Sequence, residues 1–383
     1  MQFFSSKFKL GILGGGQLGK MLLYDCKRYD IYTKVMDPNK NAPCSKIADD
    51  FTVGDLMNYE DVINFCEDAD VITVEIENVN TDALTFLEQN GKKVFPSANT
   101  LKTIQNKSKQ KDFYKKNDLP TSAYKNYTDL SGIIEDYNNG NIQLPAVWKS
   151  AKFGYDGKGV KIIHDINDIN QLPDVECLIE EKVNIKKEIS VIVARNQNNK
   201  EACFPVVEME FNDSSNLVEY VMCPAKISKE LEEIAYEIAV KTAQCFNSVG
   251  LLAVELFITN DDEILINEVA PRPHNSGHHT IECCFTSQFD QHIRSILNLP
   301  LGHTGIKIPG IMVNLVGENQ IEGDVVYKNI EELFNIPGVY THLYGKKKSR
   351  LNRKMGHITI VNKEIEEAIK IGKEIKELIK VTA

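Results

Sequence analysis

Short apolar segments alternate with helical ones over the first hundred residues, and this alternation limits the possible folds more than any other feature of the chain. The apolar segments are residues 7–13, 31–36, 50–53, 71–76 and 94–95. Strands that alternate with helices form a parallel sheet that is covered on both faces. We therefore predict an N-terminal doubly wound α/β domain over residues 1–105.

The pattern changes near Asn106, where six lysines fall between residues 102 and 116. Strand-like segments dominate after this point, and they are interrupted by a helix predicted at about 229–246. The apolar positions on one face of that helix are Leu231, Ile234, Ile238 and Phe246. We predict an α+β central domain over residues 106–298 and a small C-terminal domain over residues 299–383.

The composition excludes several classes of protein. Lys and Arg number 44 against 54 Asp and Glu, so the net charge is −10, the opposite of what a non-specific nucleic-acid binder needs. No apolar run reaches the roughly 18 residues of a membrane span. The nine cysteines show no C-x-x-C spacing and the first ten residues show no export signal, so we expect a reducing, cytoplasmic location.

A glycine turn follows the first apolar segment. Gly14, Gly16 and Gly19 match the dinucleotide-binding spacing, and Asp37 follows Gly19 by 18 residues. This pattern is compatible with an NAD-dependent oxidoreductase. Any first strand-to-helix turn of a doubly wound sheet also favours glycine, so the motif alone leaves both interpretations open.

A second glycine-rich segment, residues 154–159, lies between strand-like residues 146–149 and 160–163. It lacks the Gly-Lys-Ser/Thr ending and the following helix of a Walker loop. Its layout is typical of a glycine flap that folds over nucleotide phosphates, with Lys149 on the preceding strand facing phosphate oxygens. A plain glycine-rich hairpin is the alternative.

Glu255 and Glu268 provide the strongest argument from the residues alone. The segment 253–268 is predicted to form a hairpin that turns at Asp261 and Asp262, and a two-residue loop places Glu255 opposite Glu268. Facing carboxylates about 5 Å apart repel each other unless a cation lies between them. Oxygen ligands of this kind favour Mg²⁺, which commonly also binds nucleotide phosphates. A slipped register is the alternative.

Two further segments are rich in groups that bind anions. Arg272 lies in a loop with three histidines within six residues, His274, His278 and His279, and we favour anion binding there over zinc. Residues 346–354 hold six cations in nine positions. This second segment is either a phosphate clamp or a solvated loop.

Together these motifs identify the chain as similar to the ATP-grasp ligases, and within them to the 5-(carboxyamino)imidazole ribonucleotide synthase family. The resemblance rests on GGGQLGKM at 14–21, EIENV at 75–79, GYDGKG at 154–159, APRPHNSGH at 270–278 and RKMGH at 353–357. It implies an ATP-grasp architecture with an N-terminal parallel-sheet domain, a central ATP-grasp domain and a small C-terminal domain. It also implies a homodimer.

The resemblance further implies the reaction and the cofactors, which are ATP and Mg²⁺. Bicarbonate would be joined to the exocyclic amine of aminoimidazole ribonucleotide through a carboxyphosphate-type intermediate, with release of ADP and phosphate. The residues implied for ATP are Lys107, Lys149, Gly154, Tyr155, Asp156, Gly157, Lys158, Gly159, Val160, Glu180, Glu181, Lys182, Val183, Glu188, Asn267 and Glu268. Those implied for Mg²⁺ are Glu255 and Glu268. Lys107 departs from the family, which more often has Arg there.

The remaining implied roles concern the two other substrates. The residues for the ribonucleotide are Gln17, Leu18, Glu75, Tyr155, Asp156, Lys346 and Arg353, and those around bicarbonate are Arg272, His274, Asn275 and Ser276. Asp156, Arg272 and His274 are the candidates for catalytic roles, with Asp156 as a proton acceptor. The alternatives are another ATP-grasp carboxylate–amine ligase, the NAD-dependent oxidoreductase and a non-catalytic nucleotide sensor.

Overall fold

The structure is a computed structural model that describes residues 3–152, 159–212 and 214–383. Its N-terminal part is a parallel sheet with the strand order β3-β2-β1-β4-β5. The strands are β1 (Lys9–Leu13), β2 (Tyr32–Asp37), β3 (Asp50–Val53), β4 (Val71–Val74) and β5 (Lys93–Phe95). The order reverses beside β1, as in other doubly wound sheets. The predicted α/β domain is therefore confirmed as a parallel sheet.

Three helices and a short 3₁₀ turn cover this sheet. They are α1 (Gln17–Arg28), η1 (Pro43–Lys46), α2 (Tyr59–Cys66) and α3 (Thr81–Gln89). Asn58 and Asn80 cap α2 and α3 with their side chains, which satisfies backbone donors at the starts of these helices. Two more helices, α4 (Ala98–Ile104) and α5 (Lys107–Lys116), lead out of the domain.

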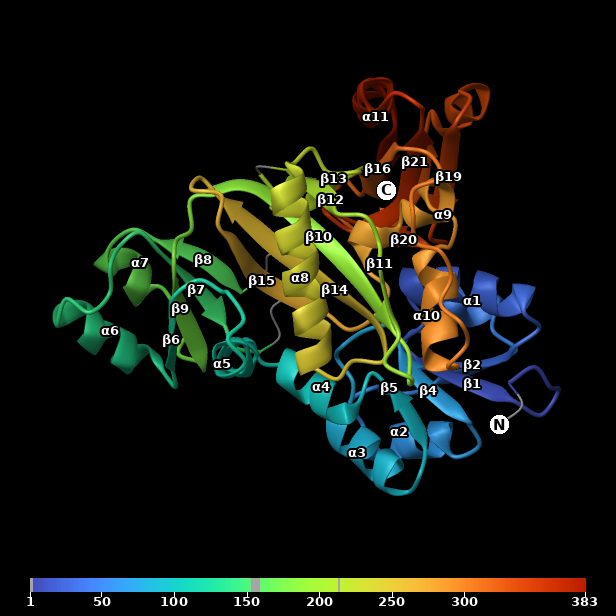
Figure 1. Ribbon diagram of the computed structural model, residues 1–383, viewed down its shortest axis with the longest axis horizontal. Helices are drawn as coiled ribbons and strands as arrows, with labels where there is room; N and C mark the ends of the chain where they lie inside the picture. Colours follow the sequence, from blue (N-terminus) through green and yellow to red (C-terminus); the bar gives the residue numbers. More distant parts are fainter. Residues whose placement is uncertain (1–2, 153–158, 213) are drawn as a thin grey trace.

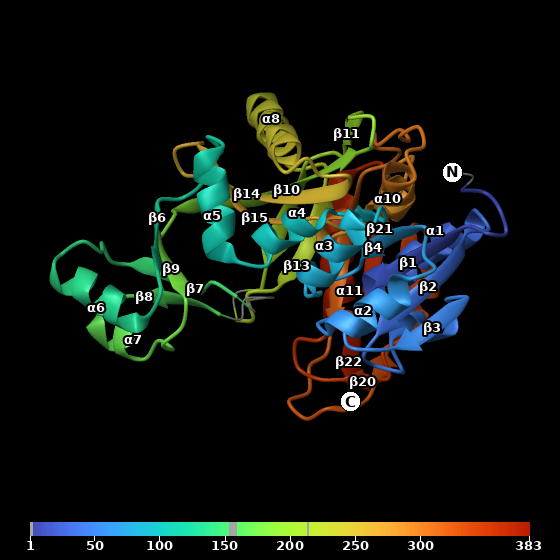
Figure 2. The ribbon, with the colours of Figure 1, turned by 90° about the horizontal axis from the view of Figure 1, so that it is seen from below.

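A smaller antiparallel sheet follows, with the order β6-β9-β7-β8. Its elements are β6 (Tyr124–Tyr127), α6 (Leu130–Asn138), β7 (Ala146–Ser150), β8 (Val160–Ile163), α7 (Ile166–Asn170) and β9 (Cys177–Glu181). Both views place this unit at one end of the molecule and the N-terminal domain towards the other (Figure 1, Figure 2). The large sheet described next lies between them.

The large sheet has the strand order β15-β14-β10-β12-β13-β16-β21-β19, with β11 paired to β10. The strands of its first half are β10 (Ile185–Arg195), β11 (Glu201–Cys203), β12 (Val207–Phe211), β13 (Val218–Cys223), β14 (Gly250–Thr259) and β15 (Ile264–Ala270). Those of its second half are β16 (Gly310–Val316), β19 (Val339–Leu343) and β21 (Lys354–Val361). Its hydrogen-bonded pairs are antiparallel.

The sheet continues across the predicted boundary between residues 298 and 299. Tyr220 of β13 pairs with Val313 of β16, so the C-terminal strands extend the sheet of the central domain instead of forming a sheet of their own. The other C-terminal elements are β17 (Gly323–Asp324), β18 (Val326–Lys328), η3 (Ile330–Asn335), β20 (Lys348–Ser349), α11 (Ile365–Leu378) and β22 (Lys380–Thr382). The domain limits 106–298 and 299–383 remain predictions.

Helix α8 (Lys229–Cys245) confirms the predicted helix and most of its predicted inward face, because Phe246 is buried and Leu231 and Ile238 pack against the same core. The side chains it buries are Ala235, Ala239, Thr242 and Ala243, whereas Ile234 is 42% exposed. Small residues let the helix axis approach β10 and β14 closely, so the larger apolar side chains lie at the margins of the contact.

The loop between β15 and β16 contains η2 (Asn275–Gly277), α9 (Thr280–Cys283) and α10 (Gln288–Ile296). Phe289 and Ile293 of α10 pack into the same apolar cluster as Leu18 and Leu22 of α1. Figure 1 shows the two helices side by side. This contact joins the central domain to the N-terminal one. No helix in the described part of the chain is long and apolar enough to cross a membrane.

Candidate active site

Glu255 of β14 and Glu268 of β15 face each other across the hairpin, as the sequence predicts. The predicted two-residue loop is wrong. Thr259 N donates to Glu263 O at 2.9 Å, so the loop is Asn260–Asp262, and Asp262 adopts a φ of 60°. Three-residue loops of this kind end in a left-handed residue, a conformation that Asp tolerates.

A β-bulge at Asn267 restores the predicted pairing. Near the loop, Leu256 pairs with Ile266, whereas one step farther along, Glu255 pairs with Glu268. Asn267 is therefore the extra residue on β15. Bulges re-aim side chains and are frequent next to active sites. Here Asn267 Oδ1 receives a hydrogen bond from Lys149 Nζ at 3.1 Å.

The two facing carboxylates have different partners. Lys107 Nζ lies 2.5 Å from Glu268 Oε2, and this ammonium group lowers the pKa of Glu268. Glu255 Oε1 lies 3.4 Å from His274 Nε2. Burial, followed by repulsion from Glu268, raises the pKa of Glu255. In the absence of a cation the pair therefore favours a state with one ionised carboxylate.

These oxygens suit a hard divalent cation. The described part of the chain holds no group of three or more His, Cys, Asp or Glu side chains that could bind a metal by themselves. Mg²⁺ characteristically takes one or two protein carboxylates and fills its other positions with water and phosphate oxygens. Glu255 and Glu268 fit that pattern if a nucleotide supplies the remaining ligands.

Lys149 lies on β7 beside a buried carboxylate. Its Nζ is 3.2 Å from Glu180 Oε2, and Ser122 Oγ donates to the same oxygen at 3.1 Å. Lys111 Nζ lies 3.3 Å from Glu180 Oε1. The Glu180 side chain is thus held between two lysines. Although burial opposes ionisation of Glu180, the two ammonium groups leave its pKa below the usual value.

Sequence analysis does not identify Lys111 as a site residue. It follows Lys107 by four positions on α5, a spacing that places both side chains on one face of the helix. Its ammonium group also donates to Thr121 Oγ1 at 2.6 Å and to Ser122 Oγ at 2.9 Å. Burial lowers the pKa of Lys111 to about 8. The helical spacing was the signal that could have found it.

The segment predicted to hold adenine and ribose begins at the end of β9. The Glu180 carboxylate faces the lysines, whereas the Glu181 side chain is exposed. Lys182 and Val183 are half-buried and lie outside regular structure. Glu188 lies on β10, and burial raises its pKa to about 7. The predicted contacts of these residues with a nucleotide remain predictions.

The flap predicted to cover the phosphates is only partly described. Gly154, Tyr155, Asp156, Gly157 and Lys158 lie outside the described residues. Beside the flap, Ser150 N donates to Gly159 O at 2.8 Å, and Val160 pairs with Lys149. The strands that flank the flap are therefore paired, and Lys149 lies at the end of the pair that is nearest the flap.

The loop after β15 brings several predicted site residues together. His274 Nδ1 lies 3.0 Å from Ser276 Oγ, which in turn lies 2.9 Å from Ser190 Oγ. Arg272 Nε is 2.8 Å from Glu77 Oε1, so this guanidinium group links the loop to the N-terminal domain. Asn275 and Asn314 exchange two amide hydrogen bonds of 2.9 Å.

The other two histidines of the loop have different neighbours. His278 is buried and stacks on His357 of β21 with ring centroids 4.7 Å apart. Buried His279 places Nδ1 3.0 Å from Ser276 O. The three imidazoles of this loop thus face different neighbours.

Carboxylates of the protein accept hydrogen bonds from backbone N–H groups of the first glycine turn. Gly15 N donates to Asp37 Oδ2 at 2.8 Å, and Leu18 N donates to Glu75 Oε1 at 3.2 Å. Buried Glu75 has a raised pKa because of its burial. A dinucleotide would need these backbone donors for its pyrophosphate. The arrangement therefore disfavours the NAD-dependent alternative. Gln17, the first residue of α1, is half-buried beside this turn.

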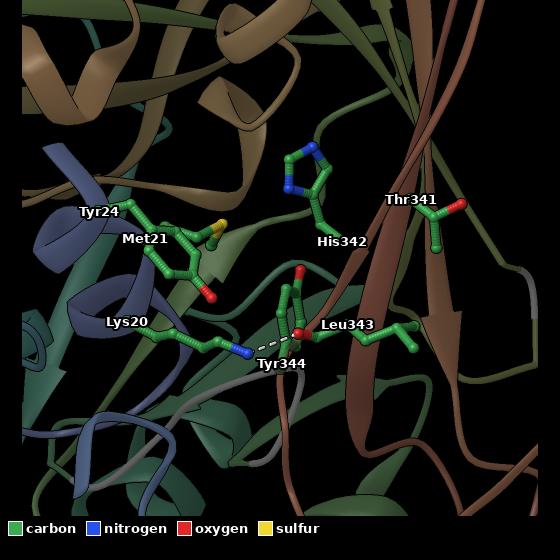
Figure 3. A pocket seen from close by; sticks show the side chains of 7 residues that line it. All are labelled: Lys20, Met21, Tyr24, Thr341, His342, Leu343 and Tyr344. Atoms are coloured by element: carbon green, nitrogen blue, oxygen red, sulfur yellow. Dashed lines mark hydrogen bonds between the residues drawn. The ribbon is translucent and has the colours of Figure 1, made fainter. Parts of the chain in front are cut away.

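The cationic segment of the C-terminal part packs against the N-terminal domain. Lys20 Nζ donates to Leu343 O at 2.8 Å, and Lys347 Nζ donates to Asn41 Oδ1 at 2.7 Å. Figure 3 shows Lys20 reaching across a cavity of about 180 Å³ between α1 and β19. Lys346 Nζ and Arg353 Nη1 donate to main-chain carbonyls of the segment itself, each at 2.8 Å. Lys347, Lys348 and Arg350 are exposed, so the phosphate clamp and the solvated loop both remain open for this segment.

Three family models match consecutive parts of the chain. They are the ribonucleotide synthetase preATP-grasp domain at residues 7–105, the ATP-grasp domain at 112–289 and the phosphoribosylaminoimidazole carboxylase C-terminal domain at 310–371. N5-carboxyaminoimidazole ribonucleotide synthase of Bacillus subtilis is 38% identical over 94% of this chain and 93% of its own length.

The chain belongs to the N5-carboxyaminoimidazole ribonucleotide synthase family. The synthase of Thermotoga maritima has a crystal structure that matches with a TM-score of 0.90 at 41% identity, covering 98% of this chain and 99% of that one. The Aspergillus clavatus synthase in complex with ADP and 5-aminoimidazole ribonucleotide matches with a TM-score of 0.88 at 32% identity, covering 97% and 98%.

Some relatives of the synthase family are longer proteins. The chloroplastic phosphoribosylaminoimidazole carboxylase of Vigna aconitifolia is 37% identical over 93% of this chain, yet the match covers only 64% of that relative. The predicted ATP-grasp architecture and the predicted family are both confirmed by these comparisons.

Proposed function

We propose that this protein is an ATP-dependent ligase that joins bicarbonate to the exocyclic amine of 5-aminoimidazole ribonucleotide in purine biosynthesis. The observation that carries the proposal is the facing pair Glu255 and Glu268, with Lys107 beside one carboxylate and His274 beside the other. A carboxylate pair next to a phosphate-binding lysine suits a metal-bound triphosphate. The complex of a related synthase with ADP and 5-aminoimidazole ribonucleotide supports the ribonucleotide as a substrate, and the family resemblance supports bicarbonate.

Bicarbonate is a poor electrophile and must be activated before an amine can attack it. A bicarbonate oxygen attacks the γ-phosphorus of ATP and ADP leaves, which gives carboxyphosphate. Lys107 and Lys149 would hold the phosphates, because their ammonium groups already face the carboxylate side of the hairpin. Mg²⁺ held by Glu255 and Glu268 would offset the charge on the phosphate oxygens.

The amine nitrogen then attacks the carboxyl carbon, phosphate leaves and the nitrogen loses a proton. Arg272 and His274 would orient the bicarbonate, together with Asn275 and Ser276 in the same loop. Asp156 is the proposed proton acceptor. Gln17, Leu18, Glu75 and Tyr155 would hold the ribonucleotide, with Lys346 and Arg353 on its phosphate.

The nucleotide site extends from the hairpin to the end of β9. Glu180, Glu181, Lys182 and Val183 would line the adenine site, and Glu188 would accept hydrogen bonds from the ribose hydroxyls. Asn267 would lie beside the phosphates, because it already contacts Lys149. A homodimer and a cytoplasmic location are parts of the same proposal.

ADP release tests the proposal. It should require 5-aminoimidazole ribonucleotide and bicarbonate together, with little release when either is omitted. Turnover with a different amine or carboxylate, and none with this pair, would instead identify another ATP-grasp ligase. Binding of Mg-ATP without turnover in any combination would favour the nucleotide sensor.

A further inference from the structure

Gln288 holds both main-chain polar groups of His274. His274 N donates to Gln288 Oε1 at 2.8 Å, and Gln288 Nε2 donates to His274 O at 2.8 Å. Gln288 is the first residue of α10 and is fully buried. No water competes for a carboxamide in such a position, so each of these hydrogen bonds is costly to lose.

The same carboxamide also fixes the state of His278. Because the His274 N–H must donate to Gln288 Oε1, the other end of the amide is the donor. That nitrogen lies 3.1 Å from His278 Nδ1, which must therefore accept and carry no proton. His278 is then a neutral imidazole protonated on Nε2, as its burial also requires.

His278 connects this arrangement to the C-terminal part of the chain. Its ring stacks on His357, and His357 stacks on His342 with centroids 4.4 Å apart. Tyr344 OH lies 3.0 Å from His357 Nδ1. His342 and Tyr344 belong to the segment, shown in Figure 3, that precedes the predicted phosphate-binding Lys346.

Gly277 makes room for the carboxamide. A Cβ on Gly277 would lie 2.5 Å from Gln288 Oε1 and 2.4 Å from Ile192 Cδ1. Thr280 completes the arrangement, because its Oγ1 accepts from Gln288 N at 2.8 Å and donates to Gly277 O at 2.6 Å. Contacts to both its main chain and its side chain therefore hold Gln288 in one position.

We propose that Gln288 is a positioning residue for the bicarbonate step. Gln288 fixes the main chain of His274, and this sets the position of the His274 imidazole beside Glu255. It also fixes that position relative to the C-terminal segment that contains Lys346 and Arg353. This role rests on the proposed function of His274. Gln288 acts through His274 and not on a substrate, so its loss should affect the use of bicarbonate more than the binding of ATP.

The helix supplies a matched control three residues away. Gln291 is equally buried on α10, donates from Nε2 to Gly302 O at 3.2 Å and accepts from Gly302 N at 2.8 Å. Gln291 thus clamps Gly302 as Gln288 clamps His274, by bonding both the N–H and the C=O of one residue. The loop that contains Gly302 has no predicted site residue. General loss of stability should follow from either substitution, whereas a positioning effect should follow from only one.

The experiment compares Gln288→Met with Gln291→Met in the full-length protein. ADP release with 5-aminoimidazole ribonucleotide gives the KM for bicarbonate and the KM for ATP. We expect Gln288→Met to raise the bicarbonate KM about tenfold or more and to change the ATP KM less than about twofold. Gln291→Met should leave both constants unchanged. An unchanged bicarbonate KM in Gln288→Met, or equal changes in the two variants, would overturn the proposal.

Amide hydrogen exchange provides a measurement that needs no substrate. The His274 amide should exchange faster in Gln288→Met, and the Gly302 amide should exchange faster in Gln291→Met. If Gln288→Met does not fold, Gln288→Asn tests the same point with a carboxamide too short to reach. Unchanged exchange at His274 refutes the clamp. Lack of bicarbonate-dependent turnover in the parent protein, with altered exchange in the variant, refutes the proposed function instead.

Discussion

The Lys107 ammonium group lies 2.5 Å from Glu268, on the strand directly opposite Glu255. Glu268 therefore has an ammonium group in contact, whereas Glu255 has the His274 imidazole at 3.4 Å. This asymmetry accounts for the opposite directions of their pKa changes.

Replacing Glu255 by Gln should separate stability from activity. Glu255→Gln removes a buried carboxylate that Glu268 repels, so we expect the free energy of unfolding without nucleotide to rise by about 1 kcal/mol. Turnover should fall about 100-fold or more, because one of the two proposed metal ligands is lost. Thermal unfolding and ADP release measure the two effects. Glu263→Gln, on an exposed position of the same hairpin, is the control. Unchanged turnover in Glu255→Gln would contradict the metal site.

Removal of Lys149 should act on the nucleotide. Lys149→Met loses the contacts with Asn267 and Glu180, while Glu180 keeps its ion pair with Lys111. We therefore expect a folded protein whose ATP KM is raised about tenfold or more. Lys161→Met on β8 is a suitable control, because Lys161 pairs with Asp168. Equal ATP KM values in the two variants would exclude a phosphate-binding role for Lys149.

Mild acid should destabilise the protein through its buried imidazoles. Burial lowers the pKa of His292 to about 3 and that of His278 and His357 well below the usual value. Each is neutral when folded but binds a proton when unfolded below about pH 6.5, so stability decreases as the pH falls through that value. At about pH 5 the loss should reach about 2 kcal/mol per imidazole. The raised pKa values of Glu188 and Glu255 act in the opposite direction, so the measurement compares the parent protein with His292→Gln by denaturant unfolding at a series of pH values. An equal pH dependence in the two proteins would refute the prediction.

The glycine turn should bind no dinucleotide. Asp37 and Glu75 already accept from the backbone donors that a pyrophosphate would use. NADH fluorescence should therefore be unchanged by the protein, while Mg-ATP binds. Asp37→Ala should lower the free energy of unfolding by about 1–2 kcal/mol, because Gly15 N loses its acceptor. Saturable NADH binding that Asp37→Ala abolishes would revive the oxidoreductase.

Gly277→Ala should disturb the loop that we propose to hold bicarbonate. The added Cβ would collide with Ile192 and Gln288 in a buried region. We expect a loss of about 1–3 kcal/mol in unfolding free energy, together with a raised bicarbonate KM. Gly132→Ala in α6 would meet only the Tyr127 side chain, at 3.3 Å, and serves as the control. Equal stability of the two variants would show that the loop has room to relax.

Much of the fold follows from local sequence patterns. The alternation in the first hundred residues predicts the parallel sheet, and the pattern at 229–246 predicts α8. The C-terminal part could not be predicted in the same way. Its strands read as a separate unit, because nothing local indicates that Val313 pairs with Tyr220, more than ninety residues earlier. On α8 only the inward position of Ile234 was wrong. The residues closest to the sheet are Ala235 and Ala239, because a short side chain lets the helix approach.

In the candidate site, too, local features could be predicted from the sequence and long-range contacts could not. The facing pair Glu255 and Glu268 was predicted correctly, although the loop was one residue longer than expected and the Asn267 bulge compensated. Gln288 was not predicted. A glutamine at the start of a helix carries no signal of its own, because its role depends on which loop packs above it.

The pairing of β13 with β16 makes the large sheet a single hydrogen-bonded body that spans two of the three family-model regions. A shortened chain that stops at residue 298 would leave β13 with a bare row of amide and carbonyl groups. We expect the exposed edge of β13 to pair with strands of other copies. A chain cut at residue 298 should therefore self-associate instead of remaining a monomer.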